Sequence, residues 1–194
     1  MKTLLALALT PLLMLLSQPT TTVDADITSS TVTWKGYKVT GSHEGTIDLQ
    51  SGNLDYNAEG NLTGGTITID MASLACTDLS GKSAQKLVGH LQSDDFFGVA
   101  TYPTATLTIT DVAPKGTPGD YKVTADLTIK ETTESIKFYA QVKDQEGTRV
   151  ATADLKIDRT DYDVRYGSGS FFDNLGDKTI YDEFDISVKL VSAL

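Results

Sequence analysis

The stretch YKVTADLTIK (121–130) alternates apolar and polar side chains over its whole length. One face of an extended chain here carries every apolar residue: Tyr121, Val123, Ala125, Leu127 and Ile129. A repeat of two residues is typical of a β-strand that buries one face and leaves the other in water. The stretch therefore predicts a strand of an antiparallel sheet, since parallel strands are usually buried on both faces.

The same repeat recurs along most of the chain, and turn-forming residues separate the repeats. The further alternating runs are GTIDLQ (45–50), TITID (66–70), PTATLTI (103–109), SIKFYAQV (135–142), ATADLKI (151–157) and DEFDISVKL (182–190). About eight strands without a long helix to cover a sheet favour a closed barrel, because closure removes exposed strand edges. We therefore expect an all-β, eight-stranded antiparallel barrel; a two-sheet sandwich is the alternative.

Several predicted inward positions carry very small side chains: Gly45, Ala105, Ala125, Ala140, Ala151 and Ala153. A barrel of about eight strands is just wide enough to be filled by side chains or to hold one small ligand. Small inward residues favour an internal cavity. The alternative is an interior filled by Trp34, Phe138, Phe184 and the helical segment.

One segment, SAQKLVGHLQ (83–92), has helical rather than strand periodicity. Its apolar residues, including Leu87 and Leu91, form one stripe, and Ser83 is a candidate N-cap. Ser93 is expected to cap a further short turn, DDFFG (94–98), whose carboxylates suit its positive end. The adjacent Phe96 and Phe97 need an apolar surface, which the mouth of the barrel would provide. The fold prediction thus includes one short helical segment near the mouth.

The chain contains two histidines, His43 and His90. His43 shares the inward parity of Ile47 and Leu49, and His90 lies beside the apolar stripe of the helix. Zinc sites use three or four ligands at short spacings, so no metal site is expected. Each histidine is either a structural residue or part of a polar group at the mouth of the cavity.

Arg159 continues the inward parity of the strand before it, and a buried charge must be paired or lie at the rim. One interpretation is a structural salt bridge with a neighbouring carboxylate: Asp158, Asp161 or Asp163. The other is a cationic lip for a ligand headgroup, since guanidinium groups suit phosphate geometry. In that case Tyr162 and Tyr166 would flank the guanidinium group.

Sequence motifs for catalysis are absent. The chain has no Gly-x-Ser-x-Gly elbow, Walker loop or dinucleotide-binding fingerprint, and its adjacent carboxylates cannot lie across a substrate from one another. Cys76 is the single cysteine, so it cannot form an internal disulfide. We predict no catalytic residue, no enzymatic activity and no cofactor.

The N-terminus predicts export. Lys2 precedes an apolar run over residues 4–16, which is shorter than the ~20 residues of a membrane span. With small residues at Val23 and Ala25, residues 1–25 are typical of a secretory signal peptide, and residues 26–194 form the mature domain without a transmembrane segment. The net charge of −10 disfavours nucleic acid and anionic membranes as partners. The expected location is the periplasm or the extracellular medium.

The segment HLQSDDFFGVATYPTATLTIT (90–110) resembles the signature of the YceI-like family of polyisoprenoid-binding, lipocalin-like proteins. Members carry His-Leu-x-Ser-x-Asp-Phe-Phe followed by Tyr-Pro-Thr-Ala. The resemblance extends in family order to WKGYKVTGSHEGTIDL (34–49), GGTITIDMASL (64–74), LTIKETTESIKF (127–138) and IDRTDYDVRYGS (157–168). The chain departs from the family at Asp163 and Glu131, where many members have glycine.

This resemblance implies an exported barrel, open at one end, whose apolar interior takes a long isoprenoid or other lipid chain. The family's mouth segment falls on His90, Leu91, Phe96 and Phe97, and another of its segments includes Arg159. We therefore hypothesise a lipid carrier or reservoir. The alternatives are an accessory enzyme acting on a lipid or quinone headgroup and a filled-barrel interaction module; a homodimer remains open. The predicted ligand-binding residues are Trp34, His43, Ile67, Leu87, His90, Leu91, Phe96, Phe97, Leu107, Phe138, Arg159, Tyr162 and Phe184.

Overall fold

The computed structural model describes residues 19–194. Residues 1–18, with the apolar run of the expected signal peptide, lie outside the described part. The described elements are β1 (Thr20–Asp24), β2 (Thr31–Lys38), β3 (Gly41–Asn57), β4 (Leu62–Cys76), α1 (Gly81–Gln92), β5 (Thr104–Pro114), β6 (Asp120–Ile129), β7 (Thr132–Gln145), β8 (Thr148–Asp158), η1 (Arg159–Tyr162), η2 (Gly176–Lys178) and β9 (Ile180–Ala193). Within this part, no helix has the length and apolar composition needed to cross a membrane.

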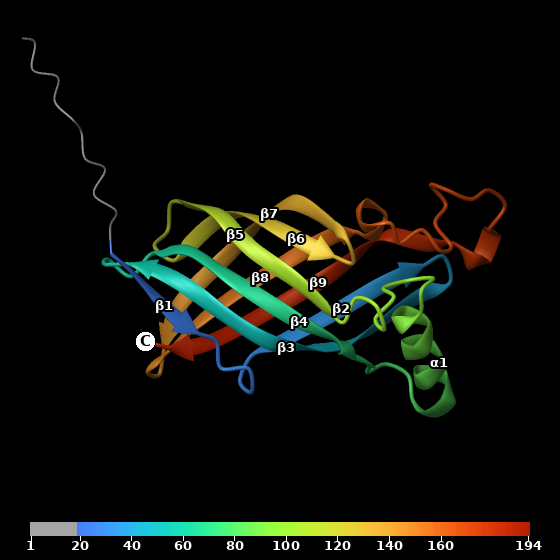
Figure 1. Cartoon of the computed structure of the whole chain (residues 1–194), viewed down its shortest axis with the longest axis horizontal. Coiled ribbons are helices and arrows are strands. Elements are labelled where there is room, and N and C mark those ends of the chain that lie inside the picture. Colours follow the sequence, from blue (N-terminus) through green and yellow to red (C-terminus); the bar gives the residue numbers. More distant parts are fainter. Residues whose placement is uncertain (1–18) are drawn as a thin grey trace, which may run out of the picture.

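All the strands belong to one antiparallel sheet that closes on itself (Figure 1). Their order is β1-β3-β2-β9-β8-β7-β6-β5-β4, and a further pairing of β3 with β4 completes the barrel. β1 and β2 share one strand position: β1 pairs with residues 53–57 of β3 and β2 with residues 41–47. On their other side lies β9, which bridges to Ala25 and pairs with β2. The predicted eight-stranded antiparallel barrel is confirmed, and the sandwich alternative is wrong.

The alternation in 121–130 places the side chains as expected. Val123 and Ala125 of β6 are fully buried, and Tyr121 and Ile129 are nearly so. They belong to a core cluster that draws residues from both ends of the chain, from Val32 to Leu190. The period of two therefore decides which face of each strand lines the interior.

β1 occupies residues that the sequence assigned to the signal peptide. Its five residues hydrogen-bond along the edge of β3, and the backbone N–H of Ala25 continues the ladder by donating to Gly52 O over 2.9 Å. Val23 packs on the core cluster. A cut after Ala25 would remove this strand from the barrel; the position of cleavage itself stays a prediction.

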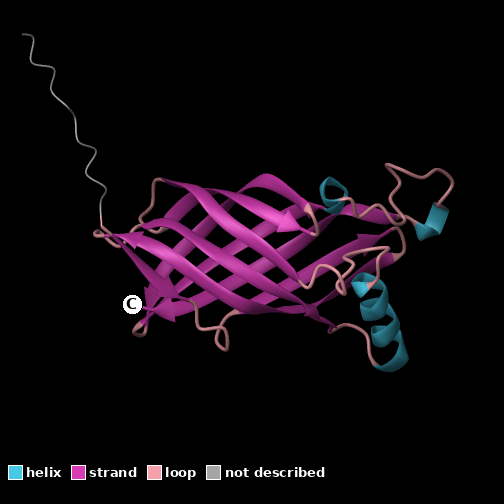
Figure 2. Cartoon of the chain, viewed as in Figure 1, coloured by secondary structure: helices cyan, strands magenta, loops and turns pink. Residues whose placement is uncertain are grey.

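α1 confirms the predicted helix but begins earlier than its apolar stripe. Ser80, with an extended backbone, is the N-cap, so Ser83 lies inside the first turn and the expected cap at Ser83 is wrong. Gly81 and Lys82 have no apolar side chains, and for this reason periodicity could not detect the first turn. The stripe with Leu87 and Leu91 is half-buried and packs on the core, and the helix lies at one end of the barrel (Figure 2).

Candidate ligand-binding cavity

The barrel encloses a cavity of about 430 Å³, within the range of about 300–1,000 Å³ typical of small-molecule sites. Every barrel strand from β2 to β9 contributes to its wall, and most lining side chains are aliphatic or aromatic. Four small residues expected to face inward do line it: Ala105, Ala140, Ala151 and Ala153. Trp34, Phe138 and Phe184 form part of the wall and do not fill the interior. The internal cavity predicted from the small inward residues is therefore present.

The two ends of the cavity differ in exposure. At the end near the C-terminus, lining residues such as Leu54, Leu62 and Leu190 are each 4% exposed. At the other end, the lining includes the half-buried Tyr37 and the exposed Tyr181. The cavity therefore opens at the second end, beside α1 and the segment of residues 164–179 (Figure 1). We call this end the mouth.

The predicted ligand-binding residues, with the exception of Tyr162, all line this one cavity. Tyr162 is 1% exposed, but it lies in η1, which packs against β7. η1 turns the chain out of the line of β8, and Tyr162 belongs to the core cluster without lining the cavity. Burial raises the pKa of the Tyr162 phenol to about 12, and its hydroxyl has no hydrogen-bond partner among the described residues. Contact of the lining residues with a ligand stays a prediction.

An aromatic cluster covers one side of the mouth. After α1, the N–H groups of Phe96 and Gly98 donate to Ser93 O, which forms a tight turn. The turn directs Phe96 against the His90 ring, with centroids 4.9 Å apart, and Tyr166 packs against both rings, 4.5 Å from His90 and 5.6 Å from Phe96. Phe97 meets Phe184 of β9 at 6.5 Å. Both phenylalanines of the DDFF sequence thus line the cavity, and Phe96 is the more buried of the two.

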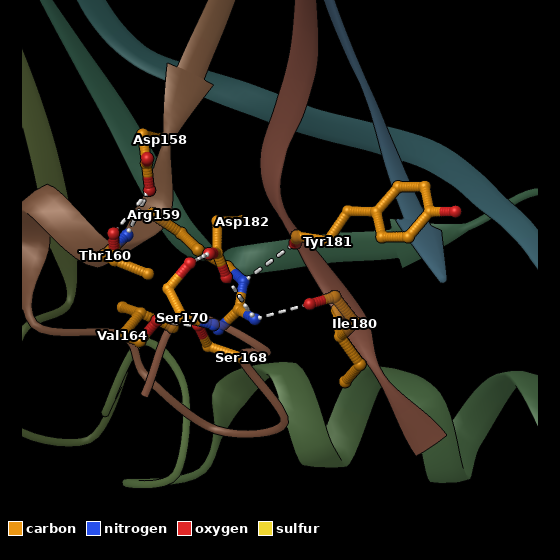
Figure 3. A network of polar contacts seen from close by, with 9 residues as sticks. All are labelled: Asp158, Arg159, Thr160, Val164, Ser168, Ser170, Ile180, Tyr181 and Asp182. Carbon is orange, nitrogen blue, oxygen red and sulfur yellow. Dashed lines mark hydrogen bonds and ion pairs between the residues drawn. The ribbon is translucent and has the colours of Figure 1, made fainter. Parts of the chain in front are cut away.

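Arg159 is bonded on every nitrogen of its guanidinium group (Figure 3). Nε donates to Tyr181 O at 3.1 Å, Nη1 donates to Val164 O at 2.6 Å, and Nη2 donates to Ile180 O at 3.1 Å. Nη2 also forms an ion pair of 3.2 Å with Asp182. The charge is therefore paired, as one interpretation required, but its partner is Asp182 and none of Asp158, Asp161 or Asp163. Those neighbours lie on the turn of η1, whereas the guanidinium group reaches across to β9.

This arrangement limits what Arg159 can do for a ligand. The side chain is 4% exposed, and burial lowers the pKa of the guanidinium group while Asp182 opposes that shift. A free phosphate clamp would offer two parallel N–H donors, and here the donors already meet main-chain carbonyl groups and a carboxylate. The group serves to hold residues 164–179 and the start of β9 together.

His43 forms a second polar cluster at the mouth. Its Nδ1 lies 2.9 Å from Oδ2 of Asp78, whose other oxygen accepts hydrogen bonds from the N–H of Glu44 and the thiol of Cys76. The hydrogen bonds from His43 and Cys76 hold the pKa of the Asp78 carboxyl well below its usual range. Burial, followed by the hydrogen bond to Asp78, raises the pKa of the Cys76 thiol. The thiol therefore keeps its proton, the opposite of a nucleophilic cysteine.

The other histidine has a weaker partner. His90 Nε2 lies 3.6 Å from Asp95, at the exposed edge of the aromatic cluster. Within residues 19–194, no group of three or more His, Cys, Asp or Glu side chains is placed to hold a metal ion.

A sequence model of the YceI-like domain matches residues 22–192 of this chain. The chain belongs to the YceI-like family. Its match covers all the barrel strands from β2 to β8 and most of β1 and β9. No match was found among curated proteins.

Solved structures similar to this YceI-like protein share its fold. BcnA from Burkholderia cenocepacia is 25% identical with a TM-score of 0.69, over 87% of this chain and 99% of that one. A polyisoprenoid binding domain from Saccharophagus degradans, implicated in plant cell wall breakdown, is 18% identical with a TM-score of 0.63, over 88% and 97%. A Campylobacter jejuni YceI protein is 19% identical with a TM-score of 0.58, over 76% and 84%.

Some residues of the cavity wall were not predicted from the sequence of this YceI-like protein. Met71 and Leu74 line the cavity from a bulge in β4, where Thr46 and Asp48 of β3 pair with Ala75 and Asp70. Met71 keeps the parity of Ile67 and Ile69 but lies beyond the alternating run 66–70. The extra residues of the bulge then bring Leu74, of opposite parity, to the same wall. Tyr37 and Tyr181 were missed for a similar reason, because the β2–β9 register shifts after Gly36. In β2, the sequence feature that could have indicated this register shift is Gly36 followed by Tyr37, which interrupts an otherwise alternating strand.

Proposed function

We propose that this YceI-like protein is an exported lipid-binding protein that holds an isoprenoid or other long-chain lipid tail in the barrel, as a carrier or reservoir. One observation carries the proposal: the cavity has an apolar wall built from all eight strand positions and a single polar end. Transfer of apolar surface from water contributes about 25 cal/mol per Å². A tail enclosed by such a wall would be held mainly by this burial.

The polar end suggests how the headgroup is accommodated. His43, His90 and Lys38 line the cavity at the mouth, while the charge of Arg159 is satisfied inside the protein. We therefore place the tail at the buried end, near Leu54 and Leu62, and the headgroup at the mouth. In this arrangement Arg159 maintains the shape of the mouth and makes no ionic contact with the headgroup.

Two further considerations support the proposal. A solved relative, the domain from Saccharophagus degradans, is itself described as polyisoprenoid binding. The apolar run over residues 4–16 is typical of a secretory signal, which agrees with a periplasmic or extracellular carrier. We propose binding without chemical conversion of the lipid, because the cavity wall is mainly apolar and the charge of Arg159 is already paired within the protein.

Extraction and ligand uptake test this function. Protein purified from its producing cells is extracted with organic solvent, and mass spectrometry of the extract should reveal a long-chain lipid. The delipidated protein should then enhance the fluorescence of cis-parinaric acid, a fatty acid probe. Ala140→Phe projects a ring into the cavity from β7 and should abolish uptake, whereas Ser135→Phe, on the exposed face of β7, should not.

The same two measurements can contradict the proposal. A protein that yields no lipid on extraction, and whose Ala140→Phe variant takes up the probe as well as the wild type, does not use this cavity for lipids. Circular dichroism of both variants checks that each is folded.

A further inference from the structure

Residues 164–179 form a loop that is anchored at the rim of the barrel, and we call it the mouth strap. Besides the bond from Arg159 to Val164 O, the N–H of Ile180 donates to Gly167 O at 2.8 Å. The N–H of Val39, in the β2–β3 turn, donates to Thr179 O at 3.1 Å. Ser170 Oγ donates to Asp182 at 2.6 Å (Figure 3). These contacts anchor both ends of the strap to the rim of the barrel.

The strap and its immediate neighbours carry large exposed apolar side chains. Phe171 and Phe172 of the strap are 47% and 51% exposed, and Tyr166 is 46% exposed. Next to the strap, Val39 is 50% and Tyr181 is 52% exposed. The other large hydrophobic residues exposed within residues 19–194 are Ile27, Tyr139 and Leu194, which lie away from the mouth. Clustered exposed apolar side chains mark a surface that meets a partner.

This apolar surface is continuous with the cavity. Ile180 and Tyr181 follow the strap directly and also line the cavity wall. Tyr166 of the strap packs on His90 and Phe96, which line the cavity from α1 and from the turn after it. An apolar chain entering at the mouth therefore passes between side chains that are themselves exposed at the strap.

The charge of the strap indicates which kind of surface it meets. The whole chain has a net charge of −10, but in the strap two basic residues, Arg165 and Lys178, balance two acidic residues, Asp173 and Asp177. The guanidinium group of Arg165 lies over the Phe171 ring at 4.6 Å. An electrically neutral tip with aromatic residues suits the interface of a zwitterionic bilayer, where aromatic rings settle at headgroup level. The acidic body would be repelled by an anionic surface.

We propose that the mouth strap docks on a lipid bilayer of low net charge, with Phe171 and Phe172 inserted into it and the cavity opening towards it. This inference rests on the proposed lipid-binding function and adds the partner from which the lipid comes. Docking in this orientation allows a tail to move between bilayer and cavity without exposure to water.

Flotation of the mature protein with phosphatidylcholine vesicles tests the inference. The wild type should float with the vesicles. Replacing both rings, in Phe171→Ser/Phe172→Ser, should lower the partition coefficient by at least about ten-fold per phenylalanine, as expected for loss of a buried aromatic side chain. The matched control is Tyr139→Ser, which removes an aromatic residue, 58% exposed, from the outer wall of β7, and it should float like the wild type.

A second variant, which gains a signal on docking, keeps the proposal testable if the double serine variant does not fold. In Phe172→Trp, brominated phosphatidylcholine should quench the new indole beyond any quenching of the buried Trp34 in the wild type. Docking is overturned if the wild type stays with the free protein fraction, if only anionic vesicles bind it, or if the serine variant floats equally well. Uptake of cis-parinaric acid in the absence of vesicles reports separately on the proposed function.

Discussion

Arg159 and Asp182 form a buried ion pair, with Nη2 3.2 Å from Oδ1, that joins the end of β8 to the start of β9 at the mouth of the cavity. The two side chains are 4% and 17% exposed, so neither is well solvated. The same guanidinium group donates to three main-chain carbonyl oxygens on the two sides of the mouth strap. The pair and its hydrogen bonds therefore determine the geometry of the opening.

Loss of the Arg159 charge should be strongly destabilising. Arg159→Met leaves Asp182 and three carbonyl groups without their donor, and removing one member of a buried pair typically costs about 3–5 kcal/mol of unfolding free energy. Urea denaturation measures this loss. The control is Asp144→Asn, which breaks the more exposed pair with Arg149 and should leave the midpoint nearly unchanged. Equal midpoints for wild type and Arg159→Met would show that the network is not stabilising.

Gly45 should not tolerate even one added methyl group. A β-carbon at this position would overlap the carbonyl oxygen of Ala75 and lie 2.7 Å from Cζ2 of Trp34. The Trp34 indole fills that space and donates to Thr46 O and Ala75 O at 3.2 and 3.1 Å. Gly45→Ala should lower the unfolding free energy by about 1–3 kcal/mol and shift the native Trp34 fluorescence. Gly36→Ala, in β2, has no atom within 4 Å of the added carbon and is the matched control.

The unfolding free energy of the barrel should decrease at acid pH as the Asp26 carboxyl becomes protonated. Hydrogen bonds, first from Ser29 and then from Thr28, lower the pKa of its carboxyl from 3.8 to about 2. Because the folded pKa is the lower one, the stabilisation is complete above about pH 5 and is lost as the pH falls towards 2. The urea midpoints of wild type and Asp26→Asn should therefore differ by a constant amount above pH 5 and converge near pH 2. A difference that persists at pH 2 contradicts this.

The alternating sequence was sufficient to predict the barrel and most of its interior. In β6, every second residue faces the core, and the same parity located His43, Ile67 and Phe138 at the cavity wall. Prediction failed where a local feature interrupts the parity. In the bulge of β4, Leu74 lines the cavity although its parity is opposite to that of Ile67 and Ile69, and after β8 the chain leaves the sheet in η1, where Tyr162 lies. The partner of Arg159 was missed because Asp182 is distant in sequence and becomes close only when β8 and β9 pair.

The departure from the family at Asp163 has a simple structural explanation. Asp163 caps η1 with a φ of 57°, in the left-handed region where glycine is least strained. Aspartate tolerates this conformation better than most residues. Aspartate can therefore hold this left-handed position where many family members have glycine, and the sequence alone could not show that the position is left-handed.

β1 also predicts where an exported chain is processed. The strand pairs with residues 53–57 of β3, Thr22 Oγ1 donates to Asp55, and removal of the strand would expose that edge of β3 to water or to another chain. We therefore expect the mature protein to retain residues 20–24, with cleavage on their N-terminal side. Intact mass and N-terminal sequencing of the exported protein measure this directly, and a mature chain that begins at Asp26 would instead place the cut after Ala25. As a matched comparison, a chain produced from Asp26 should unfold at a lower urea concentration than one produced from Pro19, because only the longer chain completes the β1–β3 ladder.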